Sequence, residues 1–423
     1  MGVFSAANKG LLSVIVSLTL AIVISANAYG KSLSPEEKLY TVGIGAYEDR
    51  LWDAAILAFN RFLAEYPQSD KAEEAMHLLG VSYFQAKDYQ QAEKALKEFL
   101  EKYPKGTRTQ LVLIKLGDTH LKLDNKKEAI DIFQRLSSLK EIDKNADAAI
   151  FALAETYIKQ GMYKEAAEEL IRFSERFPES KFKNESYYWA GEALFNLERY
   201  REAKGYYKKF FESSSGHALS DDALNGIAWC EYRSNDLKSA LFTFNKLASL
   251  YPRSELVPAA LYRSGNIYLR FSKNNDAIKT FQRLVAGYPN ERIAIDAHLE
   301  LGKLYYQRKE YAKAIPHLEK AEASEVMEMK TEASYWLGES EAAKENYKGA
   351  ISAFEKIVGY GIQDASWLPL VYVKIGVNKE RLKMTDDALS AYQKALEIVN
   401  DGELKSFAEE RVRILKAKGA SKN

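Results

Sequence analysis

The stretch that decides the fold is residues 69–103, SDKAEEAMHLLGVSYFQAKDYQQAEKALKEFLEKY. Its first half carries apolar or small residues at Met76, Leu79, Gly80 and Tyr83, which is the i, i+3, i+4, i+7 spacing of one helical face. After a short polar break, a second face of the same kind begins at Ala92. The stretch therefore predicts two antiparallel helices joined by a tight turn.

This pattern recurs ten times, first at steps of 37 residues and at the end at steps of 36 and 38. An alanine marks each repeat, at Ala55, Ala92, Ala129, Ala166, Ala203, Ala240, Ala277, Ala314, Ala350 and Ala388. Twelve residues earlier stands a small residue, Gly43, Gly80, Gly117, Ala154, Gly191, Ala228, Gly265, Gly302, Gly338 or Gly376. Four residues later comes a large one, Phe59, Leu96, Phe133, Leu170, Tyr207, Phe244, Phe281, Leu318, Phe354 or Tyr392. Internal repeats of this period predict a solenoid.

The three marked positions have a packing explanation. We expect the small residue and the alanine to let the two helix backbones approach, and the large residue to fill the space toward the next repeat. Glycine inside a helix costs about 1 kcal/mol relative to alanine, so glycine at eight of the ten positions indicates that close packing outweighs this cost.

The ends of the helices are also marked. Several second helices are followed by an aromatic residue and a proline, which ends a helix: Tyr66-Pro67, Tyr103-Pro104, Phe177-Pro178, Tyr251-Pro252 and Tyr288-Pro289. Ser69, Ser180 and Ser254 are predicted to cap the next first helices. Around Gly359-Tyr360-Gly361 the pattern weakens, and we expect the solenoid to bend or loosen there.

These residues closely resemble the tetratricopeptide repeat family, although that family's usual period is about 34 residues. The resemblance implies an all-α fold, a right-handed α-solenoid superhelix of about ten helical hairpins with a C-terminal capping helix. The Tyr-Pro variant of the repeat, as in residues 64–69, is similar to that of envelope proteins of the BamD type and of the Tol-Pal coordinator type.

The two ends of the chain complete the predicted organisation. Residues 11–24 form an apolar run of 14 residues, shorter than a spanning helix needs, and Ala26-Asn27-Ala28 offers a cleavage site. We therefore predict a signal peptide at 1–28, cleaved after Ala28, a linker at 29–35, repeats at 36–400, and a capping helix with a tail at 401–423. An uncleaved membrane anchor is the alternative.

Several classes of function have little support in the sequence. The formal net charge of +1 argues against nucleic acid as the main partner. Cys230 is the only cysteine, and it lies far from the cleavage site, so we expect neither an internal disulfide nor lipidation at a new N-terminus. The five histidines show no i, i+3 or i+4 pairing. We predict no catalytic site, no metal site and no cofactor.

The resemblance implies that the first helices line a concave groove, and this gives the candidate partner-binding residues: Tyr40, Tyr47, Phe84, Phe151, Tyr188, Phe195, Trp229, Tyr232, Tyr262 and Tyr306. Aromatic anchors are typical of protein interfaces, but each ring could instead pack between repeats. The predicted function is a periplasmic adaptor that binds envelope proteins in outer-membrane assembly, Tol-Pal linked division or assembly of a secretion machine, with membrane contact only through its partners. A scaffold for exopolysaccharide synthesis or export and a self-assembling structural protein are the alternatives.

Overall fold

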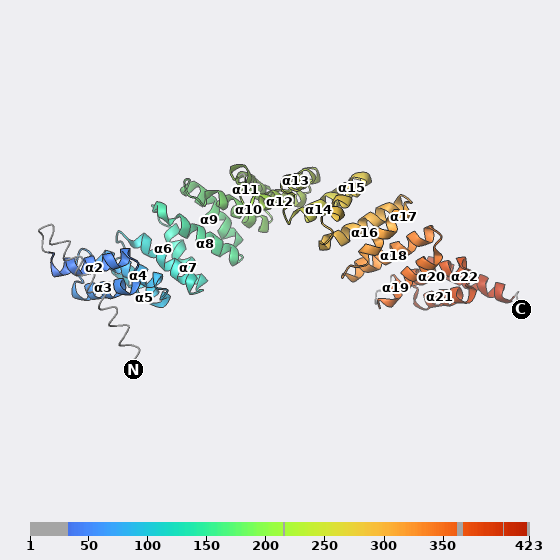
Figure 1. Cartoon of the computed structure of the whole chain (residues 1–423), viewed down its shortest axis with the longest axis horizontal. Coiled ribbons are helices and arrows are strands. Elements are labelled where there is room, and N and C mark those ends of the chain that lie inside the picture. The colour runs from blue at the N-terminus through green and yellow to red at the C-terminus, as the bar shows by residue number, and fades with distance from the viewer. Residues whose placement is uncertain (1–32, 215, 362–366, 401, 421–423) are drawn as a thin grey trace, which may run out of the picture. The chain divides into compact units, whose positions relative to one another are not determined.

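The computed structural model describes residues 33–214, 216–361, 367–400 and 402–420. The predicted signal peptide, most of the linker and the last three residues lie outside this range. The described residues form 21 α-helices and one short 3-10 helix, without a strand (Figure 1). The chain divides into two compact units, Met1–His217 and Ala218–Asn423.

The first unit holds five helical hairpins. Within it, each first helix packs on the second helix of its own repeat, and each second helix packs on the next first helix. The helices are α2 (Pro35–Glu48), α3 (Trp52–Glu65), α4 (Ala72–Gln85), α5 (Tyr89–Lys102), α6 (Thr109–Lys122), α7 (Lys126–Ser137), α8 (Asp147–Lys159), α9 (Tyr163–Arg176), α10 (Lys183–Asn196) and α11 (Tyr200–Ser213), with the 3-10 helix η1 (Lys144–Ala146) before α8.

The second unit holds five more hairpins and one terminal helix, packed in the same order. These are α12 (Ser220–Arg233), α13 (Leu237–Leu250), α14 (Val257–Arg270), α15 (Asn274–Gly287), α16 (Arg292–Gln307), α17 (Tyr311–Ala321), α18 (Met327–Ala343), α19 (Tyr347–Gly359), α20 (Leu368–Arg381), α21 (Thr385–Ile398) and α22 (Gly402–Ala420). The predicted fold class, an all-α solenoid of ten hairpins with a terminal helix, is confirmed.

The glycine of each first helix lies against the large residue of its own repeat. A Cβ on Gly191 would come within 2.8 Å of the Tyr207 ring, and one on Gly43 within 2.6 Å of Phe59. All eight glycines at this position have such a contact. The predicted close packing is therefore confirmed, but its partner is corrected: the large residue fills the space over its own glycine and not only the space toward the next repeat.

The turn between the two helices of each repeat holds a residue with a left-handed backbone. Gly161 occupies this position in the fourth repeat. The other nine repeats place a residue with a side chain there, at Arg50, Lys87, Asp124, Glu198, Asn235, Ser272, Lys309, Glu345 and Lys383. All nine have φ between 56° and 65°, a region that costs an L-residue about 1–2 kcal/mol.

The predicted serine caps lie two residues before the N-cap residues of the helices, Lys71, Phe182 and Leu256. Ser69 Oγ accepts a hydrogen bond from the backbone N–H of Lys71 at 3.1 Å, whereas α4 begins only at Ala72. Ser180 and Ser254 make the same bond to the N–H two residues on. These serines therefore stabilise the turn that precedes the helix, and the expectation that they cap the helix itself was wrong.

The terminal helix α22 covers the last repeat. Ala408 and Leu415 share a buried cluster with Tyr392 and Ala395 of α21. Arg411 of α22 adds an ion pair to Glu380 of α20. The weak junction at 359–361 has a shared core as well, because Ile357 of α19 and Val371 of α20 lie in one cluster. The expected loosening therefore does not reach the packing of these two helices.

Candidate partner-binding surface

All ten predicted aromatic residues lie on first helices, and eight of them are half-buried. We call these eight the first-helix aromatic set: Tyr40, Tyr47, Phe84, Phe195, Trp229, Tyr232, Tyr262 and Tyr306. The other two, Phe151 and Tyr188, are only 4% and 8% exposed. Their burial has visible causes. Phe151 stacks on Phe182 at 4.8 Å between ring centroids, and Tyr188 lies edge-on to Tyr207 at 5.9 Å.

Half-burial in the set has a repeated cause. Four rings near the C-terminal ends of first helices pack edge-on or tilted against the aromatic residue that opens the second helix of the same repeat. The ring centroids are 5.3–5.6 Å apart in the pairs Tyr47–Trp52, Phe84–Tyr89, Phe195–Tyr200 and Tyr306–Tyr311. Such pairs stabilise by about 0.5–1.5 kcal/mol beyond the area they bury. These rings therefore close the turn of each hairpin and remain partly exposed.

The densest part of the set within one unit surrounds Trp229 on α12. Its ring lies edge-on to Tyr232 at 5.6 Å and to the buried Phe244 at 6.0 Å. The guanidinium of Arg263, on the next first helix, lies over the Trp229 ring at 5.1 Å. An indole braced from below and flanked by a tyrosine and an arginine combines the three residue types most enriched at the energetic centres of protein interfaces.

Sequence reasoning missed a second aromatic group in the same unit. Tyr306 lies 5.0 Å from Trp336 of α18, which contacts Tyr335, and Tyr335 lies 5.2 Å from Trp367. Burial raises the pKa of the Tyr335 hydroxyl to about 12. Tyr335 stands three residues before its glycine, as the predicted Tyr188 and Tyr262 do, so the repeat alignment contained the signal that would have identified this group.

Polar contacts join neighbouring first helices along the same surface. The Tyr40 hydroxyl donates to Glu74 Oε2 at 2.7 Å, and Arg108 of the third repeat pairs with that carboxylate. Burial and the Glu74 carboxylate raise the pKa of Tyr40 well above its usual range. Lys303 Nζ bridges Glu300 and Glu332 at 3.2 and 2.9 Å. These contacts fix the relative positions of adjacent repeats within each unit.

The sequence suggested that the histidines are isolated from one another, but two of them are in contact. His298 of α16 and His317 of α17 have their Nδ1 atoms 2.7 Å apart, and the Tyr305 ring stacks on His317. One imidazole must donate to the other through Nδ1, so the accepting ring is neutral when the bond forms. Burial lowers the pKa of both, to about 4 for His298. The spacing test missed this pair because it compared residues on one helix, whereas the pair joins two.

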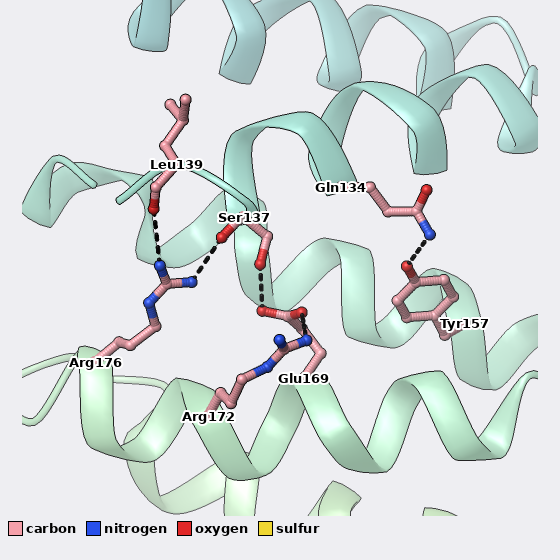
Figure 2. Close-up of polar contacts among 7 residues, drawn as sticks. All are labelled: Gln134, Ser137, Leu139, Tyr157, Glu169, Arg172 and Arg176. Carbon is pink, nitrogen blue, oxygen red and sulfur yellow. Dashed lines mark hydrogen bonds and ion pairs between the residues drawn. The ribbon is translucent and has the colours of Figure 1, made fainter. Parts of the chain in front are cut away.

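A polar cluster lies between the third and fourth repeats, where η1 lengthens the connection. Figure 2 shows Ser137 donating to the buried Glu169 at 2.7 Å, with Arg172 pairing to the same carboxylate at 2.8 Å. Arg176 donates to the carbonyls of Ser137 and Leu139 at the end of α7 (Figure 2). The side chain of Arg176 thus caps the C-terminal end of the preceding second helix.

Two further findings concern the described residues alone. In that part of the chain, no three histidine, cysteine, aspartate or glutamate side chains gather as metal ligands would. None of the helices described there has the length and apolar character needed to span a membrane.

Comparison with known families identifies the repeats. Residues 112–143, 148–180, 188–255, 262–325 and 299–365 match family models described as tetratricopeptide repeat. The chain belongs to the tetratricopeptide repeat family. Residues 33–127 match the model of an outer membrane lipoprotein family, YfiO, which corresponds to the BamD resemblance and points to the cell envelope. Proteins of the tetratricopeptide repeat family generally act as non-catalytic scaffolds that bind other proteins, and none of these models describes an enzyme.

Individual relatives of this tetratricopeptide repeat protein are distant. The outer dynein arm-docking complex subunit 4 of Xenopus laevis is 26% identical over 170 residues, which are 37% of this chain and 32% of the relative, so the chain matches about a third of its length. Among solved structures, MamA is 23% identical over 43% of this chain and 92% of its own, with a TM-score of 0.37. The C-terminal part of a tetratricopeptide repeat protein from Cytophaga hutchinsonii is 16% identical over 61% and 98%, with a TM-score of 0.48.

Proposed function

We propose that this protein is a non-catalytic adaptor of the cell envelope, exported to the periplasm, that binds segments of other envelope proteins on its first helices. The repeat family supports the binding role, and the lipoprotein family match at residues 33–127 supports the compartment. The apolar run and cleavage motif within residues 1–28 support export.

The observation that carries the proposal is the Trp229 site. Trp229 and Tyr232 are half-buried, and the buried ring of Phe244 lies edge-on to the indole. Burying the open side of a tryptophan against a partner removes apolar area from water at about 25 cal/mol per Å². Because Arg263 already lies over the ring, the site can bind an apolar side chain and a nearby carbonyl or carboxylate together.

Phe151 and Tyr188 take no part in this proposal, because their rings contact neighbouring side chains and not solvent. Tyr262 and Tyr306 extend the surface along α14 and α16 of the same unit. Four first-helix residues in one unit, Trp229, Tyr232, Tyr262 and Tyr306, are therefore the residues we expect a partner segment to contact.

The test is photo-crosslinking in living cells, with a benzoylphenylalanine probe at Tyr232 and a control probe at Lys238, an exposed residue on the second helix of the same repeat. We expect the Tyr232 probe to capture an envelope protein that Lys238 does not capture. Trp229→Ala should abolish the capture, and Phe242→Ala, which removes an exposed ring from α13, should leave it intact. Equal capture at both probes, or capture only of the chain itself, would contradict the proposal.

A further inference from the structure

The outer flank of the first repeat is an apolar surface with a cavity of about 290 Å³ between α2 and α3. We call this surface the N-terminal edge and define it by Leu39, Val42, Leu57, Arg61 and Tyr66, all of which line the cavity. Within the described part of the chain, no helix precedes α2, so nothing there covers this edge.

Comparison with interior repeats shows that the edge is incomplete. The residues at the position of Leu39 in repeats two, three, four and seven are fully covered: Met76, Leu113, Ile150 and Leu261 are at most 5% exposed. Leu39 itself is only half-buried. Terminal repeats of solenoids normally present a polar outer face, so a partly exposed leucine beside this cavity indicates a surface that is covered in use.

The edge also carries two hydrogen-bond donors, Arg61 and Tyr66. In another repeat, the residues at the same positions donate to carbonyls at the end of the preceding second helix. In the seventh repeat, Arg283 donates to the carbonyl of Ala248 at 2.9 Å and the Tyr288 hydroxyl donates to the carbonyl of Pro252 at 2.8 Å. Both carbonyls belong to the C-terminal end or exit of α13, the preceding second helix. Lys102 reaches the carbonyl of Pro67 in the same way. Side chains of a second helix therefore repeatedly cap the C-terminal end of the second helix in the preceding repeat.

Arg61 and Tyr66 stand at the positions of Arg283 and Tyr288, six and eleven residues after the marker alanine. In the first repeat Arg61 instead folds onto Glu65 of its own helix, at 2.7 Å, and both side chains are largely exposed. An exposed pair of this kind stabilises a helix only slightly, so Arg61 can exchange Glu65 for a better acceptor.

We propose that the N-terminal edge docks the C-terminal end of an amphipathic helix from a separate polypeptide. The apolar face of that helix covers Leu39 and Leu57, and its last carbonyls accept hydrogen bonds from Arg61 and Tyr66. The negative end of the helix dipole complements the guanidinium. After cleavage at Ala28, residues 29–32 are too short to form such a helix, which favours a separate polypeptide as the occupant.

The experiment places a benzoylphenylalanine probe at Leu57 of the full chain in its native cells, with a control probe at Phe242. Phe242 is the matched control because it occupies the same repeat position and is 70% exposed. Mixed isotope labelling separates contacts within one copy from contacts between copies, and mass spectrometry maps the crosslinked residue. We expect the Leu57 probe alone to crosslink within the last two turns of a helix in another protein.

The captured segment is then synthesised and its binding to the purified chain is measured. Leu57→Asp should weaken binding at least tenfold and Arg61→Ala about fivefold, with unchanged thermal midpoints, while Phe242→Asp should have no effect. A crosslink to residues 1–32, a crosslink to a second copy, no capture, or an unchanged affinity of Arg61→Ala would overturn the inference. None of these outcomes bears on the Trp229 site, whose probe at Tyr232 reports separately.

Discussion

Every hairpin imposes two backbone constraints, one at the seam between its helices and one at the turn that connects them. At the seam, eight repeats use glycine, because a Cβ would lie within 3.0 Å of the large side chain opposite. At the turn, only the fourth repeat uses glycine, at Gly161, although all ten residues have positive φ. A steric overlap inside a packed core relaxes only if the opposite side chain shifts, as it must in the two repeats that carry Ala154 and Ala228, whereas a left-handed residue costs about 1–2 kcal/mol and remains tolerable.

The largest effect is expected at the seam of the fifth repeat. Gly191→Ala would push a methyl group to within 2.8 Å of the Tyr207 ring. We expect a net loss of about 2 kcal/mol in the free energy of unfolding, because overpacking outweighs the gain of about 1 kcal/mol in helix propensity. Hydrogen exchange of α10 and α11 measures the change locally. Unaltered protection of these helices would show that the ring moves aside without cost.

The contact between His298 and His317, which joins the two helices of the eighth repeat, should make the free energy of unfolding depend on pH. His298 has a pKa of about 4 in the folded chain, below the usual 6.5, because of burial, so the unfolded chain takes up a proton first. Stability is therefore complete above about pH 6.5 and is lost as the pH falls toward 4. The double variant His298→Leu with His317→Ala introduces the residues that several other repeats carry at these two positions. Its thermal midpoint should depend less on pH between 7 and 5 than that of the unmodified chain. An unchanged slope would contradict this.

Substitution at the turn between the two helices should change the free energy of unfolding less than Gly191→Ala does, and should raise it instead of lowering it. Lys309 has φ 61°, so Lys309→Gly relieves strain, and we expect about 1 kcal/mol of stabilisation, partly offset by the greater entropy of the unfolded chain. Gly161→Lys provides the reverse substitution at the same repeat position and should destabilise by a similar amount. Urea titration of both variants measures the pair. Changes of the same sign in the two variants would refute the strain argument.

The smallest effect is expected at a glycine outside the seam. Gly205 lies in the interior of α11, and a Cβ there would have no atom within 4 Å. Gly205→Ala should therefore stabilise by about 0.5–1 kcal/mol through helix propensity alone. Because Gly191 and Gly205 belong to the same hairpin, the two alanine variants form a matched pair. A loss of stability in Gly205→Ala would show that the seam is not what distinguishes them.

Part of the candidate surface could be predicted from the repeat alignment, and part could not. The alignment placed all ten aromatic residues on first helices, because one position per repeat fixes the face on which a side chain lies. It could not tell Tyr262, which stays half-buried, from Phe151 at the same repeat position, whose ring stacks on Phe182 in the segment before α10. Burial depends on which side chain the neighbouring repeat supplies, and periodicity carries no information on that.

The sequence by itself determined the ten hairpins, their glycine seams and the terminal helix, because each follows from strong local periodicity and from sterics that permit few residue types. Only the tertiary structure decided that His298 meets His317, that Glu169 holds Ser137, and that Arg61 and Tyr66 lie at an uncovered edge. These features join residues of different helices. The physical reason is range: helix periodicity acts within four residues along the chain, whereas these contacts depend on how separate helices pack.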